Sequence, residues 1–233
     1  VNEAFRVLRT NFEFTIGTHP EQNVIIFTSL NPGSGKSHLA ANMAMSLAIK
    51  KKKVLLIDGD LRHGSTSMLV GNPGEGLSDY LNGRIADIHD ILHKGEESGL
   101  VKYFDIIPIG TIPPNPTELL FTPLLEQMIR QMRQEYDYVF IDCPPIEVVA
   151  DTPIYEQFAD RTIFVVRSGL MERSMLPEID ALYKEKKFKN MTMILNGTKT
   201  RGGRYGSHYG YGYGYGYGYG YNYNKEKNGG AKS

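Results

Sequence analysis

Six short and mostly apolar runs recur along residues 24–195, and they limit the possible folds more than any other feature of the chain. The runs are continuous rather than alternating, which is typical of strands that are buried on both faces of a sheet. Helical patterns separate several of them, including Pro123–Arg133 and Met175–Lys184. The sequence therefore predicts an α/β fold, with a mainly parallel sheet flanked by helices on both faces. The expected strands are Val24–Phe27, Val54–Ile57, Phe104–Ile109, Tyr138–Ile141, Thr162–Val166 and Met191–Leu195.

Two helix starts are also expected outside these runs. Phe5, Leu8 and Phe12 recur at helical spacing, so the N-terminus should form an amphipathic helix. Asn115 followed by Pro116 resembles a helix start, with Asn as the capping residue and Pro at the first helical position.

The first run leads into a loop of small residues with the composition of a phosphate-binding site. Such a loop, followed by a helix from Lys36 to about Lys50, presents backbone N–H groups to phosphate at a helix N-terminus. Lys36 would reach the β- and γ-phosphates, and the Ser37 hydroxyl would bind Mg²⁺. The alternative is a tight turn with an exposed lysine, but the strand, loop and helix context favours a P-loop NTPase-like fold. The predicted nucleotide-binding residues are Pro32, Gly33, Ser34, Gly35, Lys36, Ser37 and His38.

That loop departs from the usual G-x-x-x-x-G-K-[ST] pattern at its first position. Leu30 stands where the pattern has glycine, whereas Gly33, Gly35 and the Lys36-Ser37 pair remain. A search for the strict pattern would miss the loop.

Aspartates follow two of the other predicted strands. Asp58 and Asp60 come directly after Val54–Ile57, and Asp142 follows Tyr138–Ile141. Ligands of open α/β sheets bind at the carboxyl ends of the strands, and Asp142 fits a carboxylate that orients Mg²⁺. Each aspartate could instead belong to a simple turn. Their shared position beside a phosphate loop favours the functional interpretation.

The C-terminal part of the chain has a different composition. Periodicity ends after about Lys199, and we predict a globular domain over residues 1–200 and a flexible Gly/Tyr-rich tail over 201–233. Interleaved glycines raise the backbone entropy of this tail, so it should be accessible rather than packed. Nine of the fifteen tyrosines lie there: Tyr205, Tyr209, Tyr211, Tyr213, Tyr215, Tyr217, Tyr219, Tyr221 and Tyr223.

Charge and cysteine content exclude some classes of function. The formal net charge is zero, and the tail carries five basic residues against one acidic residue, so the preceding residues are acidic overall. A nucleic acid partner is therefore not expected. Cys143 is the only cysteine, which fits a reducing cytosolic setting and a small buried side chain. No apolar run is long enough to span a membrane, but the chain starts at Val1 rather than Met, so this says little about the native protein.

These motifs resemble those of the bacterial tyrosine autokinases (BY-kinases) of capsule and exopolysaccharide export systems. The resemblance covers essentially the whole chain. It includes the phosphate loop, a Walker A′ stretch over Ile57–Arg62, a Walker B stretch ending at Asp142 and the tyrosine-rich tail. Pro113–Leu120 is similar to the family's Pro-Pro-Asn-Pro segment. The resemblance implies transfer of the γ-phosphate of Mg-ATP to the tail tyrosines in trans, as part of the regulation of polysaccharide synthesis and export.

The resemblance also implies roles for single residues. Lys36, Asp58, Asp60 and Asp142 would be catalytic, with Asp58 activating the tyrosine hydroxyl and Asp60 supporting the loop and the metal. Ser37, Asp58 and Asp142 would hold Mg²⁺. Spacing alone does not identify the base, because that assignment needs a distance to the substrate oxygen.

The interpretation of two further positions, Asn196 and Ser34, is less direct. Asn196 matches in position an adenine-binding asparagine of related P-loop ATPases, but it could equally form a strand-end turn before Gly197. Ser34 stands where the family often has Glu, which should alter a side chain of the loop rather than the phosphate cradle.

The N-terminal Glu3, Arg6 and Arg9 match the family's Glu-x-x-Arg-x-x-Arg assembly motif. On residues alone they would be an exposed helix face with a weak charge pair. The resemblance implies a ring, an octamer in the family, and a cytoplasmic domain whose full-length protein is anchored in the bacterial inner membrane. It also implies a membrane-embedded activator, fused or separate, and a protein-tyrosine phosphatase.

Two other functions fit parts of the pattern. Partition and division-site ATPases resemble the chain in fold, but their loop carries a lysine where this chain has Asn31, and they lack a tyrosine ribbon. A non-catalytic assembly protein could use the tail for self-association. The retained Lys36, Ser37 and aspartates argue against that second alternative.

Overall fold

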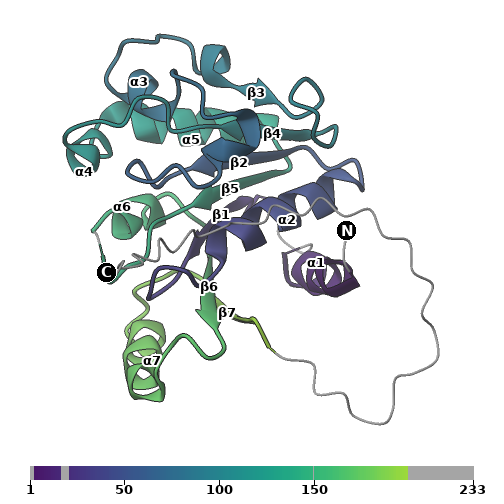
Figure 1. The fold of residues 1–233 in the computed structure, drawn as a ribbon, viewed down its shortest axis with the longest axis vertical. Coiled ribbons are helices and arrows are strands. Elements are labelled where there is room, and N and C mark those ends of the chain that lie inside the picture. The colour runs from purple at the N-terminus through teal and green to yellow at the C-terminus, as the bar shows by residue number, and fades with distance from the viewer. Residues whose placement is uncertain (1–2, 17–20, 149, 199–233) are drawn as a thin grey trace, which may run out of the picture. The chain divides into compact units, whose positions relative to one another are not determined.

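A seven-stranded sheet forms the centre of the molecule, with strand order β3-β4-β2-β5-β1-β6-β7 (Figure 1). The computed structural model describes residues 3–16, 21–148 and 150–198. Every neighbouring pair is parallel except β3 and β4, so the predicted α/β class is confirmed. The strands are β1 Val24–Thr28, β2 Val54–Asp58, β3 His93–Lys94, β4 Phe104–Ile107, β5 Tyr138–Asp142, β6 Arg161–Arg167 and β7 Thr192–Asn196.

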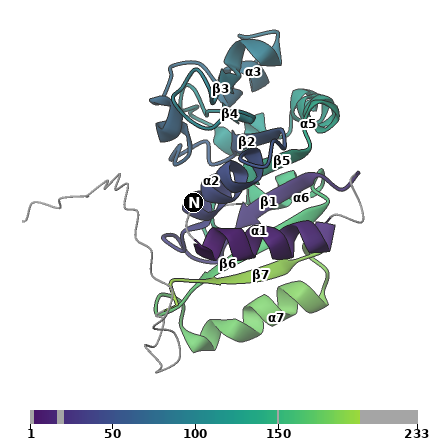
Figure 2. The same ribbon diagram turned by 90° about the vertical axis from the view of Figure 1, so that its right-hand side faces the viewer.

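The helices connect these strands and cover both faces of the sheet. The α-helices are α1 Glu3–Ile16, α2 Lys36–Ala48, α3 Leu77–Leu81, α4 Pro116–Leu119, α5 Pro123–Glu135, α6 Thr152–Glu156 and α7 Leu176–Lys184. Short 3-10 helices are η1 Ser67–Val70, η2 Ile88–Ile91 and η3 Arg173–Met175. Figure 2 shows α1 and α2 on one face and α5 and α6 on the other.

The central strands β1, β2 and β5 are buried along their whole length, as continuous apolar runs require. Side chains alternate between the two faces, so Ile25 and Phe27 pack with Met43 and Leu47 of α2. Ile26 and Ile141 pack on the opposite face with residues of α5 such as Met128. The two cores hold the carboxyl ends of the central strands in fixed positions.

Helix α1 lies against α2, and its apolar stripe confirms the predicted amphipathic helix. Phe12 is buried, and Phe5 and Leu8 pack against the same core. Arg9 adds a polar contact, because its guanidinium donates to the backbone oxygen of Ser46 at 2.8 Å and to the Ser46 hydroxyl at 3.2 Å. The exposed fraction of the Arg9 side chain is therefore only 14%.

The structure differs from the predicted elements at several places. Strand β4 ends at Ile107 rather than Ile109, because Pro108 has no N–H to continue the ladder. Strand β3 was not predicted, since two polar residues at a sheet edge give no apolar signal. Asn115 does precede Pro116 at the start of α4, but its side chain makes no capping bond and instead donates to Glu118.

Within the described ranges, no helix has both the length and the apolar character that crossing a membrane would require.

His89 joins η2 to the end of α5, and we expect His89→Gln to destabilise the protein more at low pH than at high pH. Its ring nitrogens lie 2.8 Å from Asp87 and 3.0 Å from Glu135. The hydrogen bond with Glu135, followed by that with Asp87, raises the pKa of His89 above 6.5. The resulting stability is complete below the unfolded pKa and is lost as pH rises through the folded pKa.

Urea denaturation at about pH 6 and about pH 8.5 measures this difference. His93→Gln is the matched control, because no ion pair of the His93 side chain occurs among the described residues. Equal losses for His89→Gln at both pH values would contradict the role of the ion pairs.

Candidate active site

The loop between β1 and α2 has the backbone shape of a phosphate cradle. Gly33 and Gly35 adopt the left-handed conformation, with φ of 75° and 89°. A Cβ on Gly35 would lie 2.4 Å from Nδ2 of Asn196, so glycine is required there on two grounds. The Ser34 hydroxyl donates to the backbone oxygen of Asn31 at 2.7 Å and points into the loop. The residue that replaces the family's Glu therefore braces the loop from within.

The missing first glycine of the loop has a simple physical cause. The Leu30 side chain is buried in an apolar cluster with Phe164, Val166 and Ile179. The position is thus part of the core, and the turn itself begins later, at Asn31 and Pro32.

Asp142 occupies the carboxyl end of β5, directly opposite Asp58 of β2. Its side chain is fully buried, and burial raises its pKa to about 7 although the nearby Lys36 lowers it. The Lys36 ammonium lies 3.8 Å from Asp142 Oδ1 and 3.4 Å from the Ser37 hydroxyl. Neither carboxylate oxygen of Asp142 has a hydrogen-bond partner within the described part of the chain. A buried carboxylate that accepts no hydrogen bond keeps both oxygens free for a further ligand beside the Lys36 ammonium, so these residues fit the implied Mg²⁺.

The two carboxylate oxygens of Asp58 lie in different environments. Oδ2 accepts three hydrogen bonds, from the Thr66 N–H at 2.9 Å and from the N–H and hydroxyl of Ser67, both at 2.7 Å. Oδ1 is buried and has no partner among the residues described. Burial raises the pKa of Asp58, and the bonds from Ser67 and Thr66 lower it. Only Oδ1 is therefore available to a metal or a substrate.

Asp60 faces the open part of the site. It lines a cavity of about 310 Å³ together with Gly33, Lys36 and Arg62. Its carboxylate lies 3.2 Å from Nδ1 of His63, which lines the same cavity. Asp58 and Asp142 do not line this space.

In the described residues, no group of three or more His, Cys, Asp or Glu side chains is placed to hold a metal ion by itself. A small cation bound by two carboxylates, a hydroxyl and phosphates is compatible with that finding.

Asn196 lies at the end of β7 and contacts the phosphate loop. Its amide donates to the Ser34 backbone oxygen at 3.0 Å, and its Oδ1 accepts from the Gly197 N–H at 2.8 Å. It therefore makes the predicted strand-end turn and also lies beside the loop. Its contact with adenine remains a prediction.

The side chain of His38 lies against α1 rather than in the cavity beside the phosphate loop. Its ring lies edge-on to Phe5 of α1, with the ring centroids 6.1 Å apart, and it contacts Asn42. It does not line the 310 Å³ cavity. Its predicted part in nucleotide binding therefore has no support from its side-chain position.

Sequence reasoning missed several residues of the site. Arg167 at the end of β6 donates to the Gly33 backbone oxygen at 2.8 Å, which adds a second cation to the phosphate loop. The only sequence feature that could have indicated Arg167 as a site residue is its position directly after the apolar run Thr162–Val166. Arg62 and His63 belong to the cavity wall, although the sequence analysis named Arg62 only as the last residue of the Walker A′ stretch and did not single out His63.

The structure separates the three predicted assembly residues. Glu3 and Arg6 form an exposed pair at 3.4 Å, with side chains that are 75% and 63% exposed. Arg9 instead packs against Ser46 of α2. The nine predicted phosphoacceptor tyrosines and the predicted tail lie outside the described residues.

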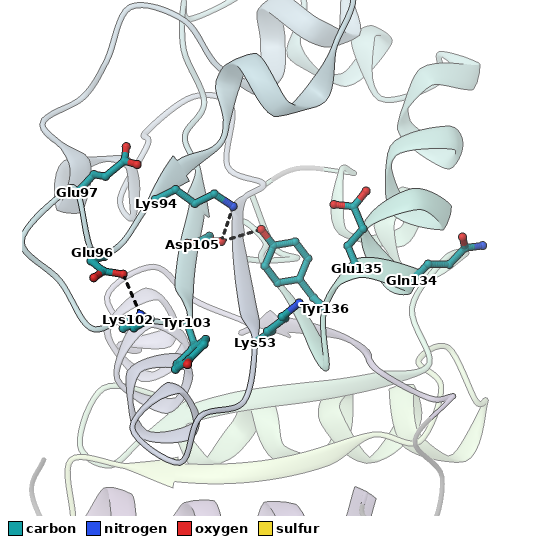
Figure 3. A pocket seen from close by; sticks show the side chains of 10 residues that line it. All are labelled: Lys53, Lys94, Glu96, Glu97, Lys102, Tyr103, Asp105, Gln134, Glu135 and Tyr136. Carbon is teal, nitrogen blue, oxygen red and sulfur yellow. Dashed lines mark hydrogen bonds and ion pairs between the residues drawn. The ribbon is translucent and has the colours of Figure 1, made fainter.

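A larger hollow, of about 550 Å³, lies at the amino ends of the strands, away from the phosphate loop (Figure 3). Its charged side chains are largely paired with one another. Asp105 accepts from Lys94 at 3.1 Å and from the Tyr136 hydroxyl at 2.8 Å, and Lys102 lies 3.6 Å from Glu96. The carboxylate oxygens without hydrogen-bond partners belong instead to Asp58 and Asp142, so the smaller cavity beside Lys36 is the candidate active site.

A phosphate loop, a lysine and buried carboxylates at the carboxyl edge of a parallel sheet define a P-loop nucleotide-binding protein. A model of the AAA domain matches residues 22–168. The chain is 32% identical over 208 residues to the tyrosine-protein kinase CpsD of Streptococcus agalactiae, covering 88% of this chain and 87% of CpsD. The chain therefore belongs to the bacterial tyrosine-protein kinase family.

Longer relatives and solved structures agree with this assignment. The chain is 35% identical over 201 residues to AmsA of Erwinia amylovora, covering 86% of this chain but only 26% of AmsA. It thus spans about a quarter of the length of such relatives. The kinase domain of the Escherichia coli tyrosine kinase ETK superimposes with a TM-score of 0.76 at 32% identity, covering 91% of this chain and 80% of that domain.

The septum site-determining protein MinD of Pyrococcus horikoshii, solved with Mg-ADP, has a TM-score of 0.60 at 23% identity, with 74% and 69% of the two chains covered. This likeness shows a shared fold and nothing more specific.

Asp142→Asn should reduce the dependence of stability on pH in the absence of nucleotide. Between the unfolded value of 3.8 and the folded value of about 7, the folded protein keeps a proton that the unfolded chain has lost. Stability therefore falls as pH rises through this window, by on the order of 4 kcal/mol in total. Denaturant unfolding at several pH values measures the slope, which should be shallower in the variant. The exposed Asp137→Asn is the control and should keep the wild-type slope, and an unchanged slope in Asp142→Asn would refute the assignment.

Proposed function

We propose that this chain transfers the γ-phosphate of ATP to tyrosines of its own C-terminal tail, with Mg²⁺ as cofactor. The observation that carries the proposal is the pair of Asp142 oxygens without hydrogen-bond partners beside Lys36, next to a loop in which Gly33 and Gly35 adopt a left-handed backbone. Family membership supports the same reaction, since CpsD and ETK are both named tyrosine kinases.

In phosphoryl transfer, different residues would bind the phosphates, hold Mg²⁺ and accept the proton. The backbone N–H groups of Gly33–Ser37 and the Lys36 ammonium bind the phosphates. Ser37, Asp142 and Oδ1 of Asp58 would hold Mg²⁺, which supplies positive charge against the phosphates when bound. The tyrosine oxygen forms a bond to the γ-phosphorus while the bond from that phosphorus to the ADP oxygen breaks. The hydroxyl proton passes to a carboxylate, for which Oδ1 of Asp58 and the cavity-lining Asp60 are the available acceptors.

The tail is the proposed acceptor because of its length and composition. A glycine-rich segment of twenty residues has an r.m.s. span of about 25 Å and a contour limit of roughly 70 Å. That reach allows a tyrosine of one copy to enter the site of a neighbour. This reach and the family's assembly motif support phosphorylation in trans within a ring.

The biological setting is part of the same proposal. We infer a cytoplasmic domain that regulates capsular or exopolysaccharide synthesis and export, with a membrane-embedded activator that is either fused to it or separate. Relatives of both sizes exist, since the match covers 87% of CpsD but only 26% of AmsA. A protein-tyrosine phosphatase would reverse the modification.

A partition-type ATPase is the second candidate, and one contact argues against it. Where those proteins carry a lysine, this chain has Asn31, whose amide donates to Glu147 at 2.6 Å. The Asn31 side chain therefore forms a hydrogen bond within the chain and provides no positive charge for a phosphate.

Mass spectrometry after addition of Mg-ATP to dephosphorylated protein should find phosphate on several tyrosines from Tyr205 to Tyr223. Lys36→Met should remove this signal, because the loop loses the cation that contacts the phosphates. Lys50→Met is the matched control, since Lys50 pairs with Glu13 at the surface rather than lining the site. ATP hydrolysis without tyrosine phosphorylation would instead favour the partition-type ATPase, and neither activity would refute both.

Glu3 and Arg6 remain candidates for the surface that joins copies in a ring, because both are exposed. We expect Arg6→Ala to shift the protein towards monomers in light scattering. Arg130→Ala is the matched control, since Arg130 forms a comparable exposed pair with Glu126 on α5. If both variants keep the wild-type mass, the assembly role of Arg6 is wrong.

A further inference from the structure

The segment Pro113–Leu120 was singled out by its sequence, yet the reaction above gives it no part. Its Thr117, on α4, makes two contacts with residues distant in sequence. The Thr117 hydroxyl donates to Asp151 Oδ1 at 2.7 Å and accepts from the Arg62 guanidinium at 2.9 Å. The segment is therefore connected to the loop after β2 and to the start of α6.

Asp151 completes a closed set of three side chains. Its carboxylate is fully buried, and its Oδ2 pairs with the guanidinium of Arg62. Arg62 and Thr117 thus occupy one oxygen of Asp151 each. A buried carboxylate that is satisfied on both sides fixes its partners, since any movement would leave a buried charge unpaired.

Arg62 still has binding capacity after these contacts. A guanidinium carries five N–H donors, and the contacts with Asp151 and Thr117 engage two of them. No other hydrogen bond or ion pair of the Arg62 side chain occurs in the ranges that the structure describes. Arg62 also lines the 310 Å³ cavity beside Gly33 and Lys36. Its guanidinium is thus held in place at the wall of the phosphate site, with donors to spare.

We propose that Arg62 binds the phosphoryl group during its transfer to tyrosine, and that Thr117 and Asp151 are positioning residues for its guanidinium. This inference rests on the proposed function. During transfer, negative charge is spread over the three equatorial oxygens of the phosphoryl group, while one P–O bond forms and the other breaks. A planar guanidinium matches such oxygens, and a fixed one stabilises them without reorganising during the reaction. The Pro113–Leu120 segment therefore contributes to catalysis through the Thr117 hydroxyl.

The test compares Thr117→Val with Thr117→Ser. Valine has nearly the shape of threonine but lacks the hydroxyl, whereas serine keeps it. Binding of ADP alone and of ADP with aluminium fluoride, both with Mg²⁺, is measured by calorimetry. Aluminium fluoride mimics the phosphoryl group in transfer, so a residue acting on the transition state affects that complex selectively.

We expect Thr117→Val to weaken binding of ADP with aluminium fluoride by roughly tenfold and to slow tail phosphorylation by a similar factor. Affinity for ADP alone should stay within about twofold of wild type, since the phosphate loop is unchanged. Thr117→Ser should resemble wild type in all three measurements. Arg62→Lys should lose affinity for the aluminium fluoride complex even though its charge is kept, because the planar fork is gone.

Three outcomes would overturn the inference. Wild-type binding of the aluminium fluoride complex by Thr117→Val would show that the hydroxyl does not position Arg62. Equal weakening of both complexes, together with a lower melting temperature, would show a structural role only. Absence of ADP binding by the wild-type protein would refute the nucleotide site and, with it, this inference.

Discussion

The pairing of β2 with β5 is the constraint on which the site depends, because it places two carboxylates opposite each other. Asp58 and Asp142 are register partners, and both are fully buried. Buried charges destabilise a fold unless they are paired or hydrogen-bonded. Ser67 and Thr66 satisfy one oxygen of Asp58, and Lys36 approaches Asp142. The remaining oxygens of both carboxylates accept no hydrogen bond from the described residues, so the apolar core holds buried polar atoms that the fold itself does not satisfy.

Much of this arrangement could be predicted from local sequence. Strands that are buried on both faces give continuous apolar runs, and carboxyl ends of parallel strands share one edge, so Asp58 and Asp142 were expected beside the loop. The left-handed backbone at Gly33 and Gly35 agrees with the phosphate loop that the sequence predicted, because only glycine adopts such a backbone freely. These features depend on residues close together in the chain or on rules that hold for any parallel sheet.

The features that were missed depend on contacts between distant segments. Arg62 follows β2, Thr117 lies on α4 and Asp151 precedes α6, and no spacing rule predicts that their side chains meet. Arg9 was expected on an exposed surface with Arg6, but the rotation of α1 against α2 turns it inward. Leu30 departs from the motif because its place in the fold belongs to the core, which only the packing reveals.

The packing of α1 on α2 has a mechanical consequence. Helix α2 begins at Lys36, and α1 contacts it near both ends, through Phe5 against His38 and through Arg9 against Ser46. Helix α2 is therefore held by α1 at two points, one of which lies in its first turn, next to the phosphate loop. A displacement of α1 would act on that first turn through Phe5, and on the sheet through Phe12, which packs against Phe140 of β5.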